Sequence, residues 1–393
     1  MIHFWNFLRT LPIAHELSER HRPYYCADSA FQTQADSIET YLDACRQRVE
    51  AARTDLNGNQ AAWVIEGNSP FVLKPDSNDG PRRGILMVHG LSDSPFMMRD
   101  LGQFFQRQGF YVLAMQLPGH GTRPGDLLDI HWRDWVASHQ RLLELLEAEV
   151  DDVYLLGFSA GATLNLYQSL RNNTIKGLFM FAPALRISAM ARLAGPLSHY
   201  GKLWRRFSWF ELQPDSDYFK YESLTNRAIH EVYEMIKAVW RLASRTERRL
   251  PVFVAASEND VAVDSRATLD WFSRQRGLPK RMLYYSTGHP WVPDKVTLVP
   301  AQLPDQNIKS FSHTALMQSP SNRHYGKQGG HCFCTHYYHL DPEKYRRCKA
   351  RQEDCLGEMF DESADCEVIR RLTYNPLFED MLAEIRVFLD GLE

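Results

Sequence analysis

Long hydrophobic runs are missing from this sequence, and its charges nearly cancel. No stretch approaches the ~18 consecutive apolar residues that a membrane-spanning helix needs, so we expect no transmembrane segment. The formal net charge is −3, which excludes a strong field that would draw the protein to nucleic acid or anionic membranes. Disorder requires low hydrophobicity with high net charge, whereas hydrophobic residues make up 44% of this chain. The composition therefore predicts a folded protein with a large core.

Cysteine is also scarce, with seven residues in a chain of 393. That number does not make a disulfide scaffold at this length, and an odd count without a secretory signal favours reduced thiols in the cytoplasm. Residues 1–14 are apolar but interrupted by His3, Asn6 and Arg9. We interpret this stretch as an amphipathic terminus of the mature protein and not as a signal peptide.

Short apolar runs alternate with amphipathic stretches through the middle of the chain. Such runs are typical of strands buried on both faces, and they occupy residues 84–88, 111–115, 153–156, 178–181, 252–255 and 282–285. Helical periodicity or helix-forming composition follows at about 97–108, 132–148, 162–170 and 266–276. The alternation predicts an α/β fold with a mostly parallel sheet and helices on both faces.

The flanking regions differ from this pattern. A helix is expected over 36–53, and a β-hairpin at 62–65 and 71–74 around Gly67-Asn68. Residues 187–246 are rich in aromatic residues and arginine, and they predict helices without a strand, inserted as a cap over a site. Further strands are expected at 296–299 and 308–311, and an amphipathic helix over 376–389.

These patterns predict six segments. They are an N-terminal helical extension with the first strands (1–80), the first half of the core (81–186), a helical cap (187–246), the second half of the core (247–319), a Cys/His-rich insertion (320–371) and a C-terminal core helix (372–393).

The sequence Gly157-Phe158-Ser159-Ala160-Gly161 matches the pattern G-x-S-x-G. It lies directly after an expected strand and directly before an expected helix, which is the context of a nucleophile elbow. The small residues at both ends of the motif let strand and helix approach closely. Ser159 is therefore the candidate nucleophile, and the backbone N–H of Ala160 the candidate oxyanion donor at a helix N-terminus.

A second oxyanion donor is expected in the loop after an earlier strand. His89-Gly90-Leu91 follows the run 84–88, and the N–H of Leu91 is the natural partner of that of Ala160. His89 precedes the turn and is interpreted as structural. His120, in a further loop, is interpreted as a residue that braces its loop.

The acid and the base of a serine hydrolase follow the nucleophile along the chain in this kind of fold. Asp260 comes just after the run 252–255 and is the preferred acid, with Glu258 and Asp264 as alternatives that are better explained as solvated charges. Two histidines could serve as the base. His289 follows the run 282–285 and is slightly favoured by periodicity alone, whereas His313 follows the run 308–311.

The insertion from 320 to 371 carries five of the seven cysteines and several histidines. These residue types can bind Zn²⁺, but the spacing is C-x-C with scattered partners and not paired C-x-x-C. We therefore expect thiols packed against the core, with no metal and no cofactor.

Three motifs together resemble the serine hydrolase group that includes monoacylglycerol lipases, bacterial carboxylesterases and serine aminopeptidase-like domains. They are His89-Gly90-Leu91-Ser92-Asp93-Ser94-Pro95, Leu117-Pro118-Gly119-His120-Gly121 and the elbow around Ser159. The resemblance covers about residues 82–320 and implies an α/β-hydrolase fold and ester hydrolysis without a cofactor, with Asp260 at the position of the group's acid. Phe311-Ser312-His313-Thr314 and the residues after it resemble a group of larger bacterial α/β-hydrolases. That likeness implies that His313, and not His289, is the base.

The resulting hypothesis is a serine esterase or lipase that forms an acyl-enzyme on Ser159. The aromatic residues of the expected cap favour a small ester with an apolar acyl group as the substrate. The same residues would also suit a peptidase or a thioesterase, and a non-catalytic binding protein can keep such a fold.

Overall fold

The computed structural model describes residues 17–24, 34–56, 58–76, 82–188, 191–201, 205–246, 249–361 and 365–392. The prediction for residues 1–14 lies outside these ranges. Within them, no helix combines the length and the apolar character that crossing a lipid bilayer requires.

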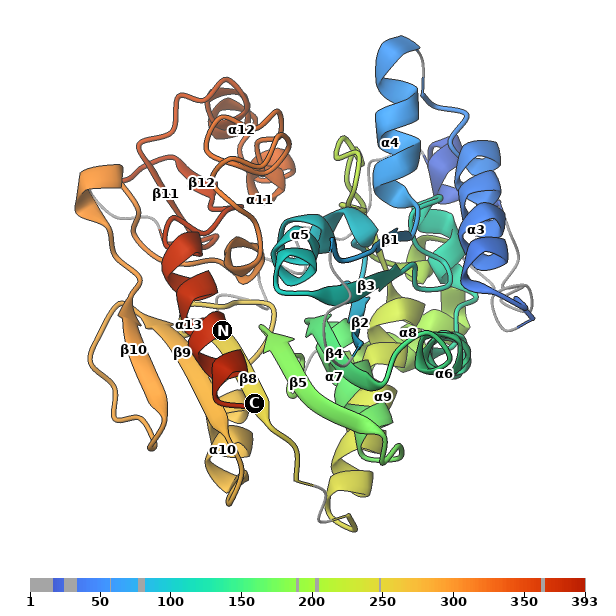
Figure 1. Ribbon diagram of the computed structural model, residues 1–393. Helices are drawn as coiled ribbons and strands as arrows, with labels where there is room; N and C mark the ends of the chain where they lie inside the picture. Colours follow the sequence, from blue (N-terminus) through green and yellow to red (C-terminus); the bar gives the residue numbers. More distant parts are fainter. Residues whose placement is uncertain are drawn as a thin grey trace. The chain divides into compact units, whose positions relative to one another are not determined.

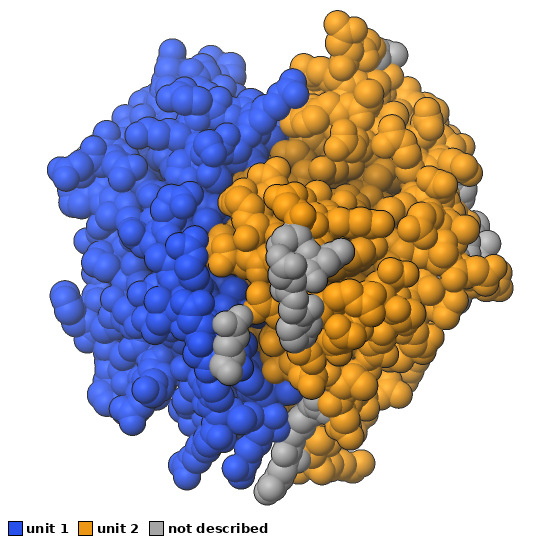
Figure 2. All heavy atoms as spheres, in the orientation of Figure 1, with its two compact units in different colours: residues 1–11, 179–188, 249–393 blue, residues 12–178, 189–248 orange. Residues whose placement is uncertain are grey.

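An eight-stranded sheet organises the chain, with the strand order β1-β3-β2-β4-β5-β8-β9-β10 (Figure 1). The described residues form two compact units (Figure 2). Unit 1 holds residues 179–188 and those from 249 onward, and unit 2 holds residues 17–178 and 191–246. Strand β5 (Ile175–Phe181) passes from unit 2 into unit 1. The predicted α/β fold with a mostly parallel sheet is confirmed.

In unit 2, three parallel strands correspond to the predicted apolar runs. They are β2 (Arg83–Val88), β3 (Phe110–Met115) and β4 (Asp152–Phe158), and β2 pairs with both others. Their central residues are buried, because helices pack against the strands. These helices are α5 (Arg99–Arg107), α6 (Trp132–Glu147) and α7 (Ala160–Ser169).

The N-terminal part of unit 2 confirms one prediction and overturns another. Helix α3 (Ile38–Ala52) is present, with a buried face at helical spacing. The expected hairpin is wrong: residues 62–65 belong to helix α4 (Ala61–Asn68), and β1 (Phe71–Leu73) pairs antiparallel with β3. The amide of Asn68 and the hydroxyl of Ser69 donate to the carbonyls of Val64 and Ile65, so side chains satisfy the last turn of a short helix. A run of four apolar residues does not distinguish helix from strand by its pattern.

The predicted cap region is mainly helical, with α8 (Ala191–Gly201) and α9 (Asn226–Ala243). Helix α9 packs against α8 and α7. The expectation that this region contains no strand is wrong, since β6 (Trp209–Glu211) and β7 (Leu224–Thr225) form a small antiparallel pair. These strands are too short for periodicity to reveal them.

Unit 1 contains the parallel strands β8 (Val252–Ser257), β9 (Lys280–Ser286) and β10 (Val296–Pro300). Helices α10 (Ser265–Arg274) and α13 (Phe378–Asp390) pack against β8 and β9. The strand expected at 308–311 is absent; Ile308 makes only isolated bridges to Leu303 and Leu356. Its partners are single residues, so no ladder extends from it.

The Cys/His-rich segment is an ordered part of unit 1. It contains α11 (Thr335–Tyr338), α12 (Pro342–Lys349) and two parallel strands, β11 (Cys355–Gly357) and β12 (Ile369–Arg371). Disulfides join Cys334 to Cys348 and Cys355 to Cys366, and these four cysteines pack in one buried cluster. The prediction of reduced thiols is therefore wrong for these residues, and the thiol argument for a cytoplasmic location loses its basis. The short spacings gave no indication of this pairing, because proximity of the chain segments decides it.

Candidate active site

Ser159 sits at a strained turn in unit 2. It follows the last residue of β4 and precedes the first residue of α7, with φ 53° and ψ −117°. Non-glycine residues rarely adopt positive φ, and such strain clusters at functional positions. A Cβ on Gly157 would lie 2.5 Å from the backbone of Ala162, and one on Gly161 would lie 2.3 Å from the carbonyl oxygen of Val88. The close approach of strand and helix thus requires glycine at both positions.

The two candidate oxyanion donors lie on neighbouring pieces of unit 2. Ala160 is the first residue of α7, where backbone N–H groups point away from the helix. The contact of Gly161 with the carbonyl of Val88 brings this helix start against the end of β2, and Leu91 lies three residues beyond that end. A tight turn follows, with φ 66° at Ser92 and a bond from the N–H of Asp93 to the carbonyl of Gly90.

Two residues that the sequence did not indicate hold this turn. Lys220 Nζ lies 2.5 Å from Asp93 Oδ1, in a pair whose carboxylate is almost fully buried. The N–H of Tyr221 donates to the carbonyl of Ser92 at 2.7 Å. The segment between β6 and β7 therefore fixes the loop of Leu91. No spacing rule connects positions 91 and 220, so only the structure reveals this pairing.

His89 and His120 are structural in their contacts, as the sequence suggested. The N–H of Leu117 donates to His89 Nε2 at 3.1 Å, and His89 Nδ1 lies 2.8 Å from the carbonyl oxygen of Gly90. His120 Nδ1 lies 3.1 Å from the carbonyl oxygen of Pro118. Burial lowers the pKa of His89 to about 4 and that of His120 to about 3. Both rings are therefore neutral at pH 7 and serve as hydrogen-bonding braces.

In unit 1 the structure brings Asp260 and His313 together. His313 Nδ1 lies 2.6 Å from Asp260 Oδ2, across 53 residues of sequence, and both side chains are buried. His289 is exposed, and within the described part of the chain it makes no hydrogen bond to a carboxylate. The pairing favours His313 over the histidine that periodicity had slightly preferred.

The carboxylate of Asp260 is fixed from its other side. Its Oδ1 accepts the N–H groups of Ala262 and Val263 at 2.8 and 3.0 Å, which leaves Oδ2 directed at the imidazole. A hydrogen-bonded carboxylate at Nδ1 sets the tautomer of the ring and leaves Nε2 to accept a proton. This is the arrangement that a general base needs.

The two alternative acids have other partners. Asp264 accepts the N–H of Arg266 at the start of α10 and pairs with Arg186 at 3.0 Å, and Glu258 accepts the hydroxyl of Ser286. Both carboxylates remain partly exposed, with 36% of the Asp264 side chain accessible, so the expectation of solvated charges is not contradicted. Each is used locally, and neither is bonded to His313 in the described structure.

The cysteines of the Cys/His-rich segment are mostly unsuited to metal binding. Four of its five are disulfide-bonded and so offer no thiolate. Cys332 is a buried free thiol. Of its histidines, His336 lies 3.2 Å from the carbonyl oxygen of Ile369, and burial lowers its pKa to about 3.

Taken singly, the two units offer complementary chemical parts. Unit 2 carries a serine in a strained turn with a helix N-terminus beside it, and unit 1 carries a histidine oriented by a carboxylate. These are the parts that nucleophilic acyl transfer requires.

The chain is similar to several known proteins. A family model described as the alpha/beta hydrolase family matches residues 85–347. The chain is 33% identical over 128 residues to a thermostable monoacylglycerol lipase from Bacillus sp. (strain H-257), a match that covers 33% of this chain and about half (49%) of that enzyme. It is 20% identical over 225 residues to a carboxylesterase from Bacillus subtilis (strain 168), covering 56% of this chain and 90% of that one. A solved structure of a monoacylglycerol lipase from Paleococcus ferrophilus superposes with a TM-score of 0.44 at 17% identity, over 55% of this chain and 88% of that chain.

Proposed function

The chain belongs to the α/β hydrolase family, and we propose that it hydrolyses carboxylic esters through an acyl-enzyme on Ser159. The observation that carries this proposal is the hydrogen bond between His313 and Asp260, since it orients a candidate base for the candidate nucleophile Ser159 at its strained turn. The names of the lipase and carboxylesterase relatives support the same class of substrate.

The proposed reaction has two halves. In the first, His313 Nε2 takes the proton of the Ser159 hydroxyl as its oxygen attacks the ester carbonyl, and the resulting oxyanion accepts hydrogen bonds from the N–H groups of Leu91 and Ala160. The imidazolium then gives its proton to the leaving alcohol as the C–O bond breaks. In the second half, water attacks the acyl-enzyme while His313 takes its proton, and the imidazolium then returns that proton to Ser159 Oγ as the acyl C–O bond breaks and the carboxylic acid leaves. Asp260 holds the imidazole and stabilises its positive charge throughout.

We propose an ester with an apolar acyl group as the substrate. Support comes from aromatic residues beside the loop of Leu91: Phe219 stacks on Phe96 with ring centroids 3.8 Å apart, and Trp63 packs edge-on against Phe219 at 4.8 Å. Phe96 and Phe219 are buried, so the loop rests on an apolar aromatic cluster.

The first test is the removal of the nucleophile. We expect Ser159→Ala to lower the turnover of p-nitrophenyl butyrate by at least about three orders of magnitude, because only binding and the oxyanion donors remain. A fluorophosphonate should label the wild-type protein once and the variant not at all.

A matched control is available at the far end of helix α7. Ser169 is buried in α7 and its hydroxyl donates to the carbonyl of Leu166 at 2.8 Å. Ser169→Ala should keep both turnover and labelling. Turnover by a folded Ser159→Ala variant within tenfold of wild type would remove Ser159 from the mechanism.

A further inference from the structure

The Cys/His-rich segment places one buried carboxylate against the loops of Asp260 and His313. Glu358 follows β11 directly and is 0% exposed. Its Oε2 accepts the backbone N–H of His313 at 3.0 Å, and the N–H of Val261, next to Asp260, lies 3.4 Å from the same oxygen. One carboxylate oxygen of Glu358 therefore faces two backbone N–H groups, one from the loop of Asp260 (the acid loop) and one from the loop of His313 (the base loop).

The negative charge of Glu358 is paired with a buried arginine. Arg371, at the end of β12, places Nε 2.7 Å from Oε1 and Nη2 3.1 Å from Oε2 of this carboxylate. Both side chains are buried, and a buried charge is tolerated only when it is paired and hydrogen-bonded. The register of the two strands sets this pair, since Gly357 lies opposite Arg371.

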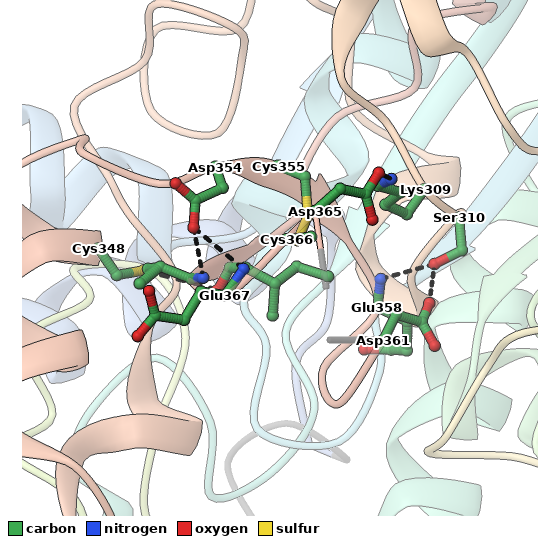
Figure 3. The surroundings of a disulfide bond; sticks show 12 residues. Lys309, Ser310, Cys348, Asp354, Cys355, Glu358, Asp361, Asp365, Cys366 and Glu367 are labelled. Carbon is green, nitrogen blue, oxygen red and sulfur yellow. Dashed lines mark hydrogen bonds and ion pairs between the residues drawn. A yellow bond between two sulfur atoms is a disulfide. The ribbon is translucent and has the colours of Figure 1, made fainter. Parts of the chain in front are cut away.

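The backbone of Glu358 is fixed as firmly as its side chain. Its N–H donates to the hydroxyl of Ser310 at 2.9 Å, and that hydroxyl donates in turn to Asp361, as Figure 3 shows. The preceding strand runs beside the chain that leads to His313, because Leu356 exchanges backbone hydrogen bonds with Asn307 and Lys309, both at 2.8 Å. The chain that leads to His313 is thus fixed by backbone hydrogen bonds to Leu356, and His313 itself is fixed by the side chain of Glu358.

We propose that Glu358 is a positioning residue for the hydrolytic site, and that the disulfide-bonded segment supplies it. The inference rests on the proposed function, because it concerns the same Asp260 and His313. Glu358 touches neither substrate nor reacting atoms in this proposal. It holds the Asp260–His313 hydrogen bond at 2.6 Å by fixing the backbones on both sides of it.

The role predicts a particular kinetic signature. Small errors in the position of a catalytic group lower the rate of the chemical step without weakening substrate binding. We expect Glu358→Gln, which keeps the shape but loses the charge opposite Arg371, to lower kcat on p-nitrophenyl butyrate by about 10- to 100-fold with KM nearly unchanged. Fluorophosphonate should still label Ser159 to completion, at a rate reduced in the same proportion.

A neighbouring ion pair provides the control. Glu353 pairs with Arg370 at 2.8 Å in the same segment, and both are largely buried. In the described structure neither forms a hydrogen bond to the acid or base loop. Glu353→Gln should lower the melting temperature but leave kcat within about twofold of wild type.

A spectroscopic readout separates positioning from a loss of stability alone. The proton between His313 Nδ1 and Asp260 should give a strongly downfield ¹H NMR signal in the wild type and in Glu353→Gln. In Glu358→Gln we expect this signal to shift or broaden. If Glu358→Gln does not fold, Arg371→Lys is the substitute, because it keeps the cation but loses the hydrogen bond from Nη2 to Oε2, and it should lower kcat in the same way.

The inference is overturned if folded Glu358→Gln matches Glu353→Gln in kcat and in the NMR signal. It is equally overturned if Glu358→Gln does not fold and Arg371→Lys keeps full kcat. Failure of the proposed function looks different, since the wild type itself would then neither hydrolyse the ester nor take up the fluorophosphonate.

Discussion

At the scale of single residues, two histidines compete for the role of the base. His289 lies just beyond β9, where the last parallel strand of many such folds delivers a histidine, but it is exposed. His313 begins a short helical turn farther along the chain, and its ring is hydrogen-bonded to Asp260. The difference lies in the partner of each ring and not in its distance from a strand.

Measuring both single variants separates the two histidines. We expect His313→Ala to lower the turnover of p-nitrophenyl butyrate by about a thousandfold or more, since losing the base leaves only binding and the oxyanion donors. His289→Ala should change the rate by no more than about twofold, as is usual for exposed residues. Circular dichroism excludes unfolding as the cause. The opposite pattern, with loss of activity only in His289→Ala, would assign the base to His289.

At the scale of elements, the strands β11 and β12 matter for the proposed site because their pairing sets the positions of Glu358 and Arg371. Three residues per strand form too small a ladder to be stable in isolation. The disulfide between Cys355 and Cys366 compensates, because it links the first residue of β11 to a residue shortly before β12. Its surroundings, shown in Figure 3, include both Glu358 and the segment of Lys309 and Ser310.

Removing this disulfide tests the element. We expect the double variant Cys355→Ser/Cys366→Ser to lower the free energy of unfolding of the protein by about 3 kcal/mol, the size expected from the loop it closes. It should also lower kcat, because Glu358 and Arg371 lose their fixed register. Urea denaturation and steady-state kinetics measure the two effects.

The other disulfide provides the comparison. Cys334 and Cys348 join α12 to the residue before α11 and do not bound β11. Cys334→Ser/Cys348→Ser should cost stability while keeping most of kcat. Equal losses of kcat in both double variants would mean that the segment acts only through general stability.

At the scale of the whole molecule, buried histidines link stability to pH. Burial lowers the pKa of His89 and His139 to about 4, and that of His120 and His336 to about 3, from an ordinary value of 6.5. In the unfolded chain these rings bind protons near pH 6.5, whereas in the folded chain they resist protonation until pH 3–4. Their contribution to stability is therefore complete above pH 6.5 and is lost as the pH falls towards 4 and 3.

The free energy of unfolding should accordingly fall steeply between pH 7 and pH 4, as urea denaturation at a series of pH values would measure. His139 is the best single probe, because its Nε2 lies 2.8 Å from Asn165 Oδ1 and the amide of a glutamine could replace that bond. We expect the pH-dependent loss in His139→Gln to be smaller by about 3 kcal/mol. Identical pH slopes in the two proteins would contradict the assignment.

The sequence by itself determined the parts of this protein that depend on local pattern. Apolar runs and helical periodicity located the main strands and helices, because a buried strand and an amphipathic helix leave different repeats in the chain. The elbow was evident from its glycines, since the close approach of β4 and α7 admits no side chain there. Asp260 was predicted as the acid from its position after a buried strand, and that role stays a prediction.

Only the tertiary structure decided the features that join distant segments. The partner of Asp260, the disulfides, the pair of Lys220 with Asp93 and the contacts of Glu358 all link residues whose separation in sequence follows no rule. The helix at 61–68 belongs here as well, because a short apolar run suits either structure and its neighbours choose between them. A local pattern records which surface a segment buries, but not which other segment covers it.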